Sequence, residues 1–367
     1  MMPPPKTTHA RRAEISISGR VVGENHAPYV IAEIGVNHDG DEARAIRLVE
    51  AAAAAGADAV KFQLFEAERL MSRASRLAKY QADAGERDPV EMLRRLELSI
   101  DELGPCVERA HKAGIHTIVS VFSVELVEVA ERLPWDAYKS ASPDIINRPL
   151  LEAMAKTGKP LIISTGAATI DEIMRALGWL EPWRESLAVL QCVSSYPTPR
   201  KAAELDGITA LRAVYDGPVG YSDHTRETAT AADAVALGAC ILEKHFTHNR
   251  AQPGPDHAAS LEPAALAEYA RLARAAFDHR AALAPAPPAA RAYKRITPIE
   301  EDVRRVSRQS LVAVRSMPAG HTLTAADLTI KRPGTGIPPF ELASTLGRRL
   351  ARAVEADTPL GPADLQP

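Results

Sequence analysis

The chain has 367 residues, a hydrophobic content of 46% and a formal net charge of −3, which suit one large domain with a sizeable core and a second, smaller domain. The slight acidic balance argues against a nucleic-acid-binding surface, so any anionic ligand must be held by local lysines and arginines. No run is long and apolar enough to span a bilayer, residues 1–20 lack the apolar segment of a secretory signal, and the three cysteines show no paired spacing; we therefore expect a cytoplasmic protein with reduced thiols.

The N-terminal part is predicted to form a hairpin followed by a first strand and helix. Apolar and polar residues alternate over residues 14–18 before Gly19, which predicts a small hairpin that closes the bottom of a barrel. The apolar run Tyr29–Gly35 predicts a buried strand. The helix after it should begin after Asp41, a suitable N-cap, and end at Gly56.

A second strand, over residues 58–63, carries polar side chains at alternate positions. Lys61 and Gln63 face one way, whereas Val60 and Phe62 face the other. In a closed parallel barrel, this arrangement places a cation in the lumen.

The same pattern repeats along the chain and predicts a (β/α)8 TIM barrel, which typically takes roughly 250 residues and carries its chemistry at the carboxyl ends of the strands. A doubly wound open sheet is the competing fold, but no glycine-rich dinucleotide loop follows the first strand. The eight expected strands start at Tyr29, Asp58, Thr117, Ala137, Pro160, Leu187, Gly217 and Ala239.

Polar side chains gather where these strands end, and this face is the predicted site. The polar residues expected there are Glu33, Lys61, Gln63, Ser120, Lys139, Ser142, Ser164, Thr165, Tyr196, Ser222, His224, Lys244 and His245.

Two histidines follow the last two strands and predict a metal site. An alanine-rich helix, roughly residues 228–237, connects these strands, so they should lie side by side and parallel. A single histidine after a strand is more often structural, but His224 and His245 emerge at the same end of the sheet among acids and hydroxyls. A pair of imidazoles in such surroundings suits a divalent transition metal.

The domain boundaries follow from composition. Residues 1–280 should form the catalytic barrel with its hairpin, and the Pro/Ala-rich residues 281–303 a semi-rigid linker. Residues 304–367 contain short β runs broken by turn residues, which predict a small, mostly β domain.

The chain resembles the sialic acid synthase (N-acetylneuraminate synthase) family, whose members join phosphoenolpyruvate to an N-acylated amino sugar. The likeness runs from Val30 onward, and the tail resembles the family's antifreeze-like (SAF) domain through Lys331-Arg332-Pro333-Gly334. Seven motifs in order carry the resemblance: Ile31-Ala32-Glu33-Ile34-Gly35-Val36-Asn37-His38, Val60-Lys61-Phe62-Gln63, Leu96-Glu97-Leu98-Ser99, Ile163-Ser164-Thr165-Gly166, Tyr221-Ser222-Asp223-His224-Thr225, Glu243-Lys244-His245-Phe246-Thr247 and Pro253-Gly254-Pro255-Asp256-His257.

The resemblance implies a role for each part of the site. His224 and His245 would bind a divalent cation, usually Mn²⁺, with Mg²⁺ or Co²⁺ as alternatives. Lysines and hydroxyls would bind the phosphoenolpyruvate trianion through charge-assisted hydrogen bonds worth roughly 1.5–3 kcal/mol each. The implied phosphoenolpyruvate residues are Lys61, Ser120, Lys139, Ser142, Ser164, Ser195 and Ser222; the implied sugar contacts are Gln63, Tyr196, Asp256 and Arg332; and Glu33, Lys61 and Asp144 are the candidates for catalysis.

The resemblance also implies a domain-swapped homodimer. Arg332 would then reach from the small domain into the barrel mouth of the partner subunit, although the sequence alone leaves open whether it acts in cis or in trans. Three of the proposed residues have structural alternatives: Glu33 as a buried acid paired with Lys61, Tyr196 as a packing aromatic, and Arg332 as a solvated cation.

Several positions depart from the family pattern and leave the exact sugar open. Ser195 stands where an asparagine is usual, Val121 where a proline is common, and Arg226 and Glu227 where small or apolar residues are common. Asp144 replaces the glutamate of some relatives.

Three functions compete. The preferred one is a nonulosonate synthase that condenses phosphoenolpyruvate with an N-acylated amino sugar such as N-acetylmannosamine and releases phosphate by C–O cleavage; a 2,4-diacetamido-6-deoxy hexose, giving a legionaminic-type acid, is the alternative substrate. The second is a metal-dependent sugar-phosphate aldolase or related condensing enzyme, and the third a non-catalytic sugar-binding protein. No motif lysine or histidine is missing, which favours the enzyme.

Overall fold

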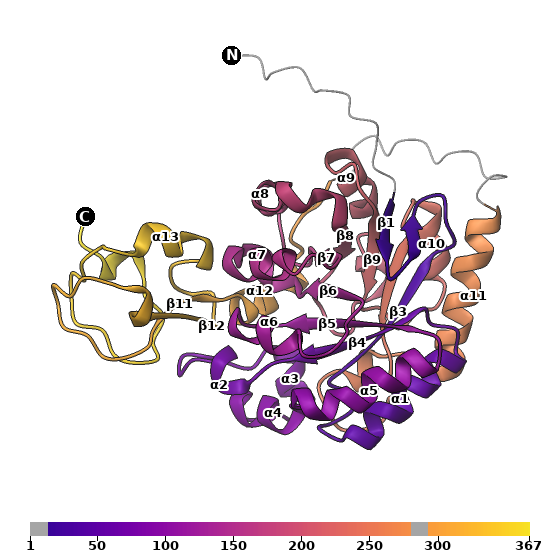
Figure 1. Cartoon of the computed structure of the whole chain (residues 1–367), viewed down its shortest axis with the longest axis horizontal. Helices are drawn as coiled ribbons and strands as arrows, with labels where there is room; N and C mark the ends of the chain where they lie inside the picture. Colours follow the sequence, from indigo (N-terminus) through magenta and orange to yellow (C-terminus); the bar gives the residue numbers. More distant parts are fainter. Residues whose placement is uncertain (1–13, 280–292) are drawn as a thin grey trace, which may run out of the picture.

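The structure is a computed structural model, and it describes residues 14–279 and 293–367. Its centre is a closed barrel of eight parallel strands in chain order, in which the last strand pairs with the first (Figure 1). This confirms the predicted (β/α)8 fold. The barrel strands are β3 (Tyr29–Gly35), β4 (Ala59–Leu64), β5 (His116–Val121), β6 (Ala137–Ser140), β7 (Leu161–Ser164), β8 (Leu187–Cys192), β9 (Val219–Asp223) and β10 (Ile241–His245).

Helices surround the barrel, and side-chain caps fix where several of them begin. Asp41 accepts a hydrogen bond from the Arg44 amide, and Ser99 and Thr169 form capping boxes with Glu102 and Glu172. The helices of the barrel domain are α1 (Glu42–Ala54), α2 (Ala67–Leu70), α3 (Lys79–Asp83), α4 (Pro89–Leu96), α5 (Ile100–Lys112), α6 (Glu125–Ala130), α7 (Arg148–Lys156), α8 (Ile170–Trp179), α9 (Asp206–Val214), α10 (Thr230–Ala236) and α11 (Pro263–His279).

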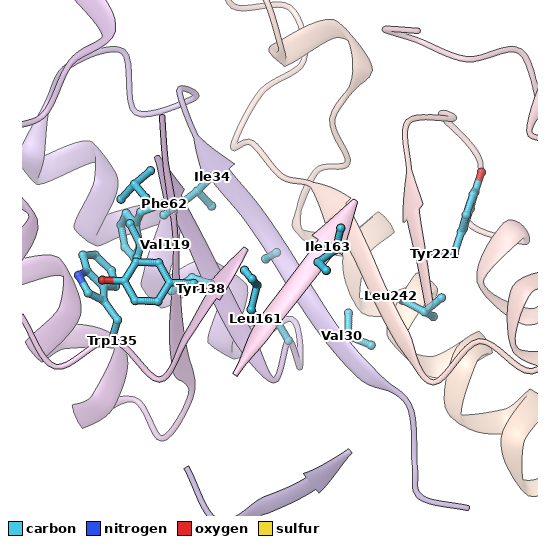
Figure 2. Close-up of a cluster of buried hydrophobic side chains, with 14 of the residues drawn as sticks. Val30, Ile34, Phe62, Val119, Trp135, Tyr138, Leu161, Ile163, Tyr221 and Leu242 are labelled. Atoms are coloured by element: carbon cyan, nitrogen blue, oxygen red, sulfur yellow. The ribbon is translucent and has the colours of Figure 1, made fainter. Parts of the chain in front are cut away.

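Alternation along the strands separates two cores. Outward side chains such as Val30, Phe62 and Tyr138 pack in one large cluster between strands and helices (Figure 2). Inward side chains such as Ile31 form a second cluster with Ile15 and other residues of the hairpin. The hairpin, β1 (Glu14–Ile17) with β2 (Arg20–Gly23), therefore closes the amino-terminal end of the barrel, as predicted, and leaves the opposite end for the site.

The C-terminal domain has its own small core around Leu311, Leu350 and Leu360. It contains the antiparallel strands β11 (Ser310–Ala313) and β12 (Leu328–Lys331) and the short helix α13 (Leu342–Thr345), and it lies to one side of the barrel (Figure 1).

A segment that we call the strap, residues 294–309, crosses from the barrel to this domain and contains helix α12 (Glu301–Ser307). The predicted linker, residues 281–303, lies partly outside the described residues. Its described end is not an extended spacer, because it packs against the barrel through buried polar groups: the Lys294 ammonium donates to the Cys192 carbonyl at 2.9 Å.

No helix in residues 14–279 or 293–367 has the length and apolar composition of a membrane span. The three cysteines are buried and free, as expected from their spacing.

Candidate active site

A cavity opens at the carboxyl ends of the barrel strands, where sites of this fold usually lie. Side chains from nearly every barrel strand, from helices α3, α4 and α12 and from the C-terminal domain surround it. They are Glu33, Val36, Lys61, Gln63, Tyr80, Gln81, Met92, Leu93, Leu96, Ser120, Phe122, Lys139, Ala141, Ser142, Pro143, Ser164, Ser194, Tyr196, Ser222, His224, Glu243, His245, Pro255, Asp256, Val303, Ser307 and Arg332.

Two buried lysines and two buried glutamates form the floor. Lys139 pairs with Glu243 at 2.8 Å, and Lys61 pairs with Glu33. Burial alone would raise the pKa of Glu243, but Lys139 and Lys61 outweigh it and bring this pKa down to about 2. Burial lowers the pKa of Lys61, but Glu33 and Glu243 raise it by more. The floor therefore holds buried charged groups of both signs.

Hydroxyl groups complete the floor. Ser222 donates to Glu243 at 3.0 Å, and Ser142 donates to Ser164 at 2.8 Å while its own oxygen accepts from the Gly166 amide. Ser120 lies 3.4 Å from the Lys61 ammonium. Cations and hydroxyls this close together suit a small polyanion.

The two predicted imidazoles meet, with ring centroids 5.3 Å apart. The Nδ1 atom of His224 lies 2.7 Å from the Val193 carbonyl, which can only accept, so Nδ1 carries the hydrogen and the neutral ring keeps a lone pair on Nε2. Burial, and after it His224 and Lys61, lower the pKa of His245 well below its usual value, which keeps this ring neutral.

Two imidazoles this close together, when neutral, offer lone pairs that fit a divalent transition metal. Asp256 lies 3.5 Å from the Nδ1 atom of His245, and burial, together with Glu33, raises the pKa of Asp256 to about 6. Nowhere in the described chain do three or more His, Cys, Asp or Glu side chains converge as a ready-made metal cluster. The remaining positions around a cation would have to come from water or substrate.

Cys192 lies beside His224, with its sulfur 3.7 Å from Nδ1. Burial lowers the pKa of His224, but Cys192 raises it by more. Burial likewise raises the pKa of the thiol, but His224 and Lys139 lower it to about 7. A proton and a metal therefore compete for this imidazole.

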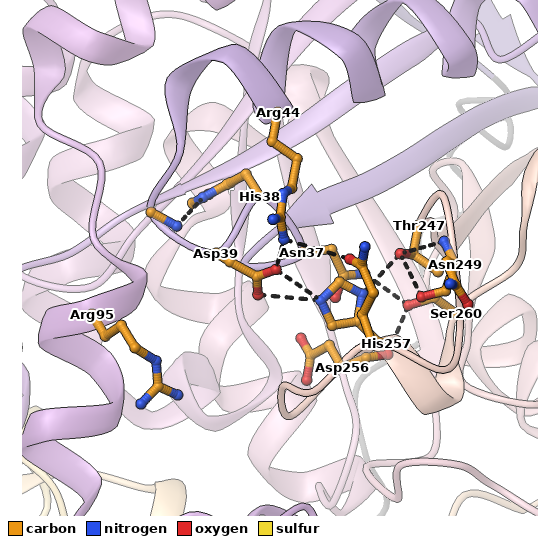
Figure 3. A network of polar contacts seen from close by, with 12 residues as sticks. Asn37, His38, Asp39, Arg44, Arg95, Thr247, Asn249, Asp256, His257 and Ser260 are labelled. Carbon is orange, nitrogen blue, oxygen red and sulfur yellow. Dashed lines mark hydrogen bonds and ion pairs between the residues drawn. The ribbon is translucent and has the colours of Figure 1, made fainter.

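The loop that carries Asp256 is fixed by a polar network (Figure 3). Asn37 donates to the Ser260 hydroxyl at 2.8 Å, and Ser260 donates to the Asp256 carbonyl at 2.7 Å. His257 lies between Thr247 and Asp39, at 2.8 Å and 3.2 Å. These residues of the sequence motifs therefore hold the site in place and do not themselves line it.

Arg332 of the C-terminal domain lines the cavity of its own chain. Its carbonyl accepts hydrogen bonds from the hydroxyls of Ser72 and Ser75 at 2.6 Å and 3.0 Å, which anchors the β12 end to the barrel. Burial lowers the pKa of Arg332, and Asp144 acts against this effect. Asp144 itself is buried outside the cavity lining, and burial raises its pKa to about 7.

The structure places two of the expected residues, Ser195 and Lys244, outside the cavity. Ser194, not Ser195, lines the cavity; the Ser195 hydroxyl lies 3.5 Å from the Pro197 carbonyl. Lys244 points away from the lumen and pairs with Asp223 at 2.9 Å, because successive residues of a strand face opposite sides. The inward residue is Glu243, and the same alternation that places Lys61 and Gln63 in the lumen also predicts its orientation.

The strap holds two of the loops that build this site. One oxygen of the Glu300 carboxylate accepts hydrogen bonds from the amides of Ala167 and Ser194 at 2.7 Å and 2.8 Å, and the other accepts from Thr297. Glu300 thereby links the chain beyond the barrel to the loops that follow β7 and β8.

Replacing Glu300 by Ala should lower the free energy of unfolding by about 2–4 kcal/mol, since it removes hydrogen bonds to a charged group and leaves buried amides without an acceptor. Urea unfolding would measure the change. Glu301→Ala is the matched control, because the Glu301 side chain is exposed on the adjacent residue. Equal stability of the two variants would show that the strap contact does not stabilise the fold.

Comparisons with known proteins agree with this geometry. The sequence matches the NeuB family over residues 48–282 and the SAF domain over residues 308–366. It is 35% identical to the N,N'-diacetyllegionaminic acid synthase of Legionella pneumophila, over 92% of this chain and 94% of that protein. It is also 35% identical to the N-acetylneuraminate-9-phosphate synthase of Mus musculus, over 92% of this chain and 93% of that protein. The crystal structure of spore coat polysaccharide biosynthesis protein spsE from Bacillus subtilis superimposes with a TM-score of 0.84 at 28% identity, covering 97% of this chain and 99% of that one.

Proposed function

Because the chain belongs to the NeuB family of nonulosonic acid synthases, we propose that it condenses phosphoenolpyruvate with the open-chain aldehyde of an N-acylated amino sugar and releases phosphate. The observation that carries this proposal is the floor of the cavity, where Lys61, Lys139 and the serine hydroxyls lie beside the two imidazoles. A floor of this kind suits a small carboxylate that also bears a phosphate.

Binding of the enol phosphate would use both lysines. Lys139 would exchange part of its interaction with Glu243 for the ligand, and Lys61 part of its interaction with Glu33, while Ser142, Ser164 and Ser222 donate to the phosphate or carboxylate oxygens. Held in this way, C3 of the enol faces the sugar, so the lysines contribute chiefly by positioning the reactants.

The reaction forms a bond between C3 of phosphoenolpyruvate and the aldehyde carbon. Water adds to the cationic C2 that results, the aldehyde oxygen takes a proton, and phosphate leaves with cleavage of its bond to C2. When bound by His224 and His245, a divalent cation such as Mn²⁺ supplies Lewis-acid polarisation of the aldehyde.

Proton transfer is assigned among the acids that line the cavity. Glu33 lines it and contacts Lys61, whereas Asp144 lies behind the wall and faces Arg332, so Glu33 is the better placed of the two candidates. Gln63, Tyr196, Asp256 and Arg332 would contact the sugar. Association into a homodimer is part of the same proposal, although in this structure Arg332 lines the cavity of its own barrel and not that of a partner.

The test measures phosphate release from phosphoenolpyruvate in the presence of Mn²⁺ and a panel of amino sugars. We expect release that depends on both the sugar and the metal. The absence of release with every N-acylated amino sugar would remove the condensing function and favour a binding protein. Release with a sugar phosphate, but with none of the uncharged sugars, would favour the sugar-phosphate condensing enzyme.

A further inference from the structure

The relatives make different products, so membership of the family does not identify the sugar substrate. The side chains of the outer half of the cavity indicate which kind of sugar fits. One wall there consists of apolar side chains that belong to a single hydrophobic cluster, separate from the barrel lumen. The members of this cluster that line the cavity include Val36, Met92, Leu93, Leu96 and Phe122, and we call them the apolar wall.

Charges are unevenly distributed over the cavity. Of the described lysines and arginines that line it, Lys61 and Lys139 belong to the floor, and Arg332 alone belongs to the outer part, where it faces Asp144 and lies over the Phe122 ring. A sugar phosphate placed against the apolar wall would lose water without gaining enough cations, which is costly for a dianion. A methyl group of an acyl or deoxy substituent would lose nothing there.

Helix α3 supplies the polar groups next to the apolar wall. The Tyr80 ring packs at a tilt against Tyr196 with centroids 4.9 Å apart, and Tyr196 packs in the same way against His224 at 4.1 Å, so a row of aromatic rings connects the imidazoles with α3. Burial, and then Asp256, raise the pKa of Tyr80, so its hydroxyl stays protonated and can donate.

Gln81 completes this group. Its Oε1 atom accepts from the Ala78 amide at 2.9 Å, which orients the side chain and leaves hydrogens on Nε2 to donate. Helix α3 is itself held by the strap: the Lys79 amide donates to Asp302 at 2.8 Å, and Ala78 and Tyr80 pack on Val303 and Val306. A short helix fixed from both sides can present Tyr80 and Gln81 at defined positions.

We infer that the outer half of the cavity receives an uncharged, methyl-bearing end of the amino sugar and excludes a sugar phosphate. Tyr80 and Gln81 donate hydrogen bonds to this end. The inference rests on the proposed condensation and names the class of sugar that it uses. A sugar with an acylated nitrogen or a deoxy carbon at the position remote from the aldehyde meets both the apolar wall and the two donors.

The first experiment compares three sugars with the full-length protein, phosphoenolpyruvate and Mn²⁺: N-acetylmannosamine, its 6-phosphate, and a 2,4-diacetamido-6-deoxy hexose. We expect kcat/KM for the 6-phosphate to be at least roughly 100-fold below that of the better uncharged sugar. The phosphate would be buried without enough cationic partners, which strongly disfavours its binding. Fastest turnover of the 6-phosphate would overturn the inference and leave the condensation standing. No release with any of the three would remove both.

Variants of α3 test the two residues. Tyr80→Phe should raise the KM for the sugar about threefold to tenfold, the loss of one hydrogen bond, and leave the KM for phosphoenolpyruvate unchanged. Lys79→Gln is the control, because the Lys79 side chain is 78% exposed on the same helix. An equal rise in both KM values would show that Tyr80 only supports the fold.

A gain of function provides the complementary test. Gln81→Arg adds a cation beside the apolar wall and should raise the ratio of kcat/KM for the 6-phosphate to that for N-acetylmannosamine by about tenfold. The ratio is measured within one variant, so a general loss of activity does not affect it. An unchanged ratio would place Gln81 outside the contact with the sugar.

Discussion

Replacing Lys139 by Met should lower kcat/KM roughly 10²- to 10⁴-fold, because the lysine would make about two charge-assisted contacts with the enol phosphate at ~1.5–3 kcal/mol each. The KM for phosphoenolpyruvate should rise. Phosphate release at saturating sugar measures the effect, and Lys156→Met, on the exposed face of α7, is the control. Activity within a few-fold of that of the unchanged protein would show that Lys139 does not bind phosphoenolpyruvate.

The same variant should also be less stable, because it leaves Glu243 without the nearer of its two lysines. Removing one partner of a buried pair costs about 3–5 kcal/mol. Adding Glu243→Gln should restore much of this stability without restoring activity, which separates the structural role of the pair from its role in binding.

The pH dependence of stability should shift in a defined direction. The pKa of Glu243, about 2, is depressed below the value of an unfolded glutamate, ~4.3, so its contribution to stability is present above pH ~4.3 and is lost as the pH falls towards 2. Without Lys139, the pKa of Glu243 in the folded state rises. The loss of stability on acidification should then be smaller and should end at a higher pH, which melting curves recorded between pH 2 and 7 would show.

Replacing His224 by Ala should abolish uptake of Mn²⁺, since the two imidazoles are the metal-binding groups that the site offers. Turnover should fall on the order of 10³-fold, because Lewis-acid polarisation contributes several kcal/mol. Calorimetric titration with Mn²⁺ measures binding without reference to activity.

His248→Ala is the matched control for this change, because His248 is an exposed histidine three residues beyond His245. It should bind Mn²⁺ as the unchanged protein does. Retained uptake by the His224 variant would mean that other groups hold the cation.

Sequence patterns predicted the barrel well because each strand is a short apolar run that ends in polar residues. The same alternation that placed Lys61 in the lumen also determines that Glu243 faces inward and Lys244 outward. Both residues belong to one motif of polar residues, whose composition alone does not distinguish the inward glutamate from the outward lysine.

Other parts of the site could not be read from the sequence. Ser194 and Ser195 are adjacent and identical in kind, so only the turn geometry decides which hydroxyl lines the cavity. Helices α3 and α12 span five and seven residues, too few for a clear periodicity, and their positions depend on each other through contacts across more than two hundred residues of sequence.

The strap also bears on how the protein is made. Because Lys294 and Glu300 follow all eight barrel strands in the chain, the loops after β7 and β8 leave the ribosome well before the groups that hold them. A chain still in synthesis can close its sheet while its pocket stays unfinished. Catalytic competence should therefore appear only with the last part of translation, and an interrupted product would consume no substrate.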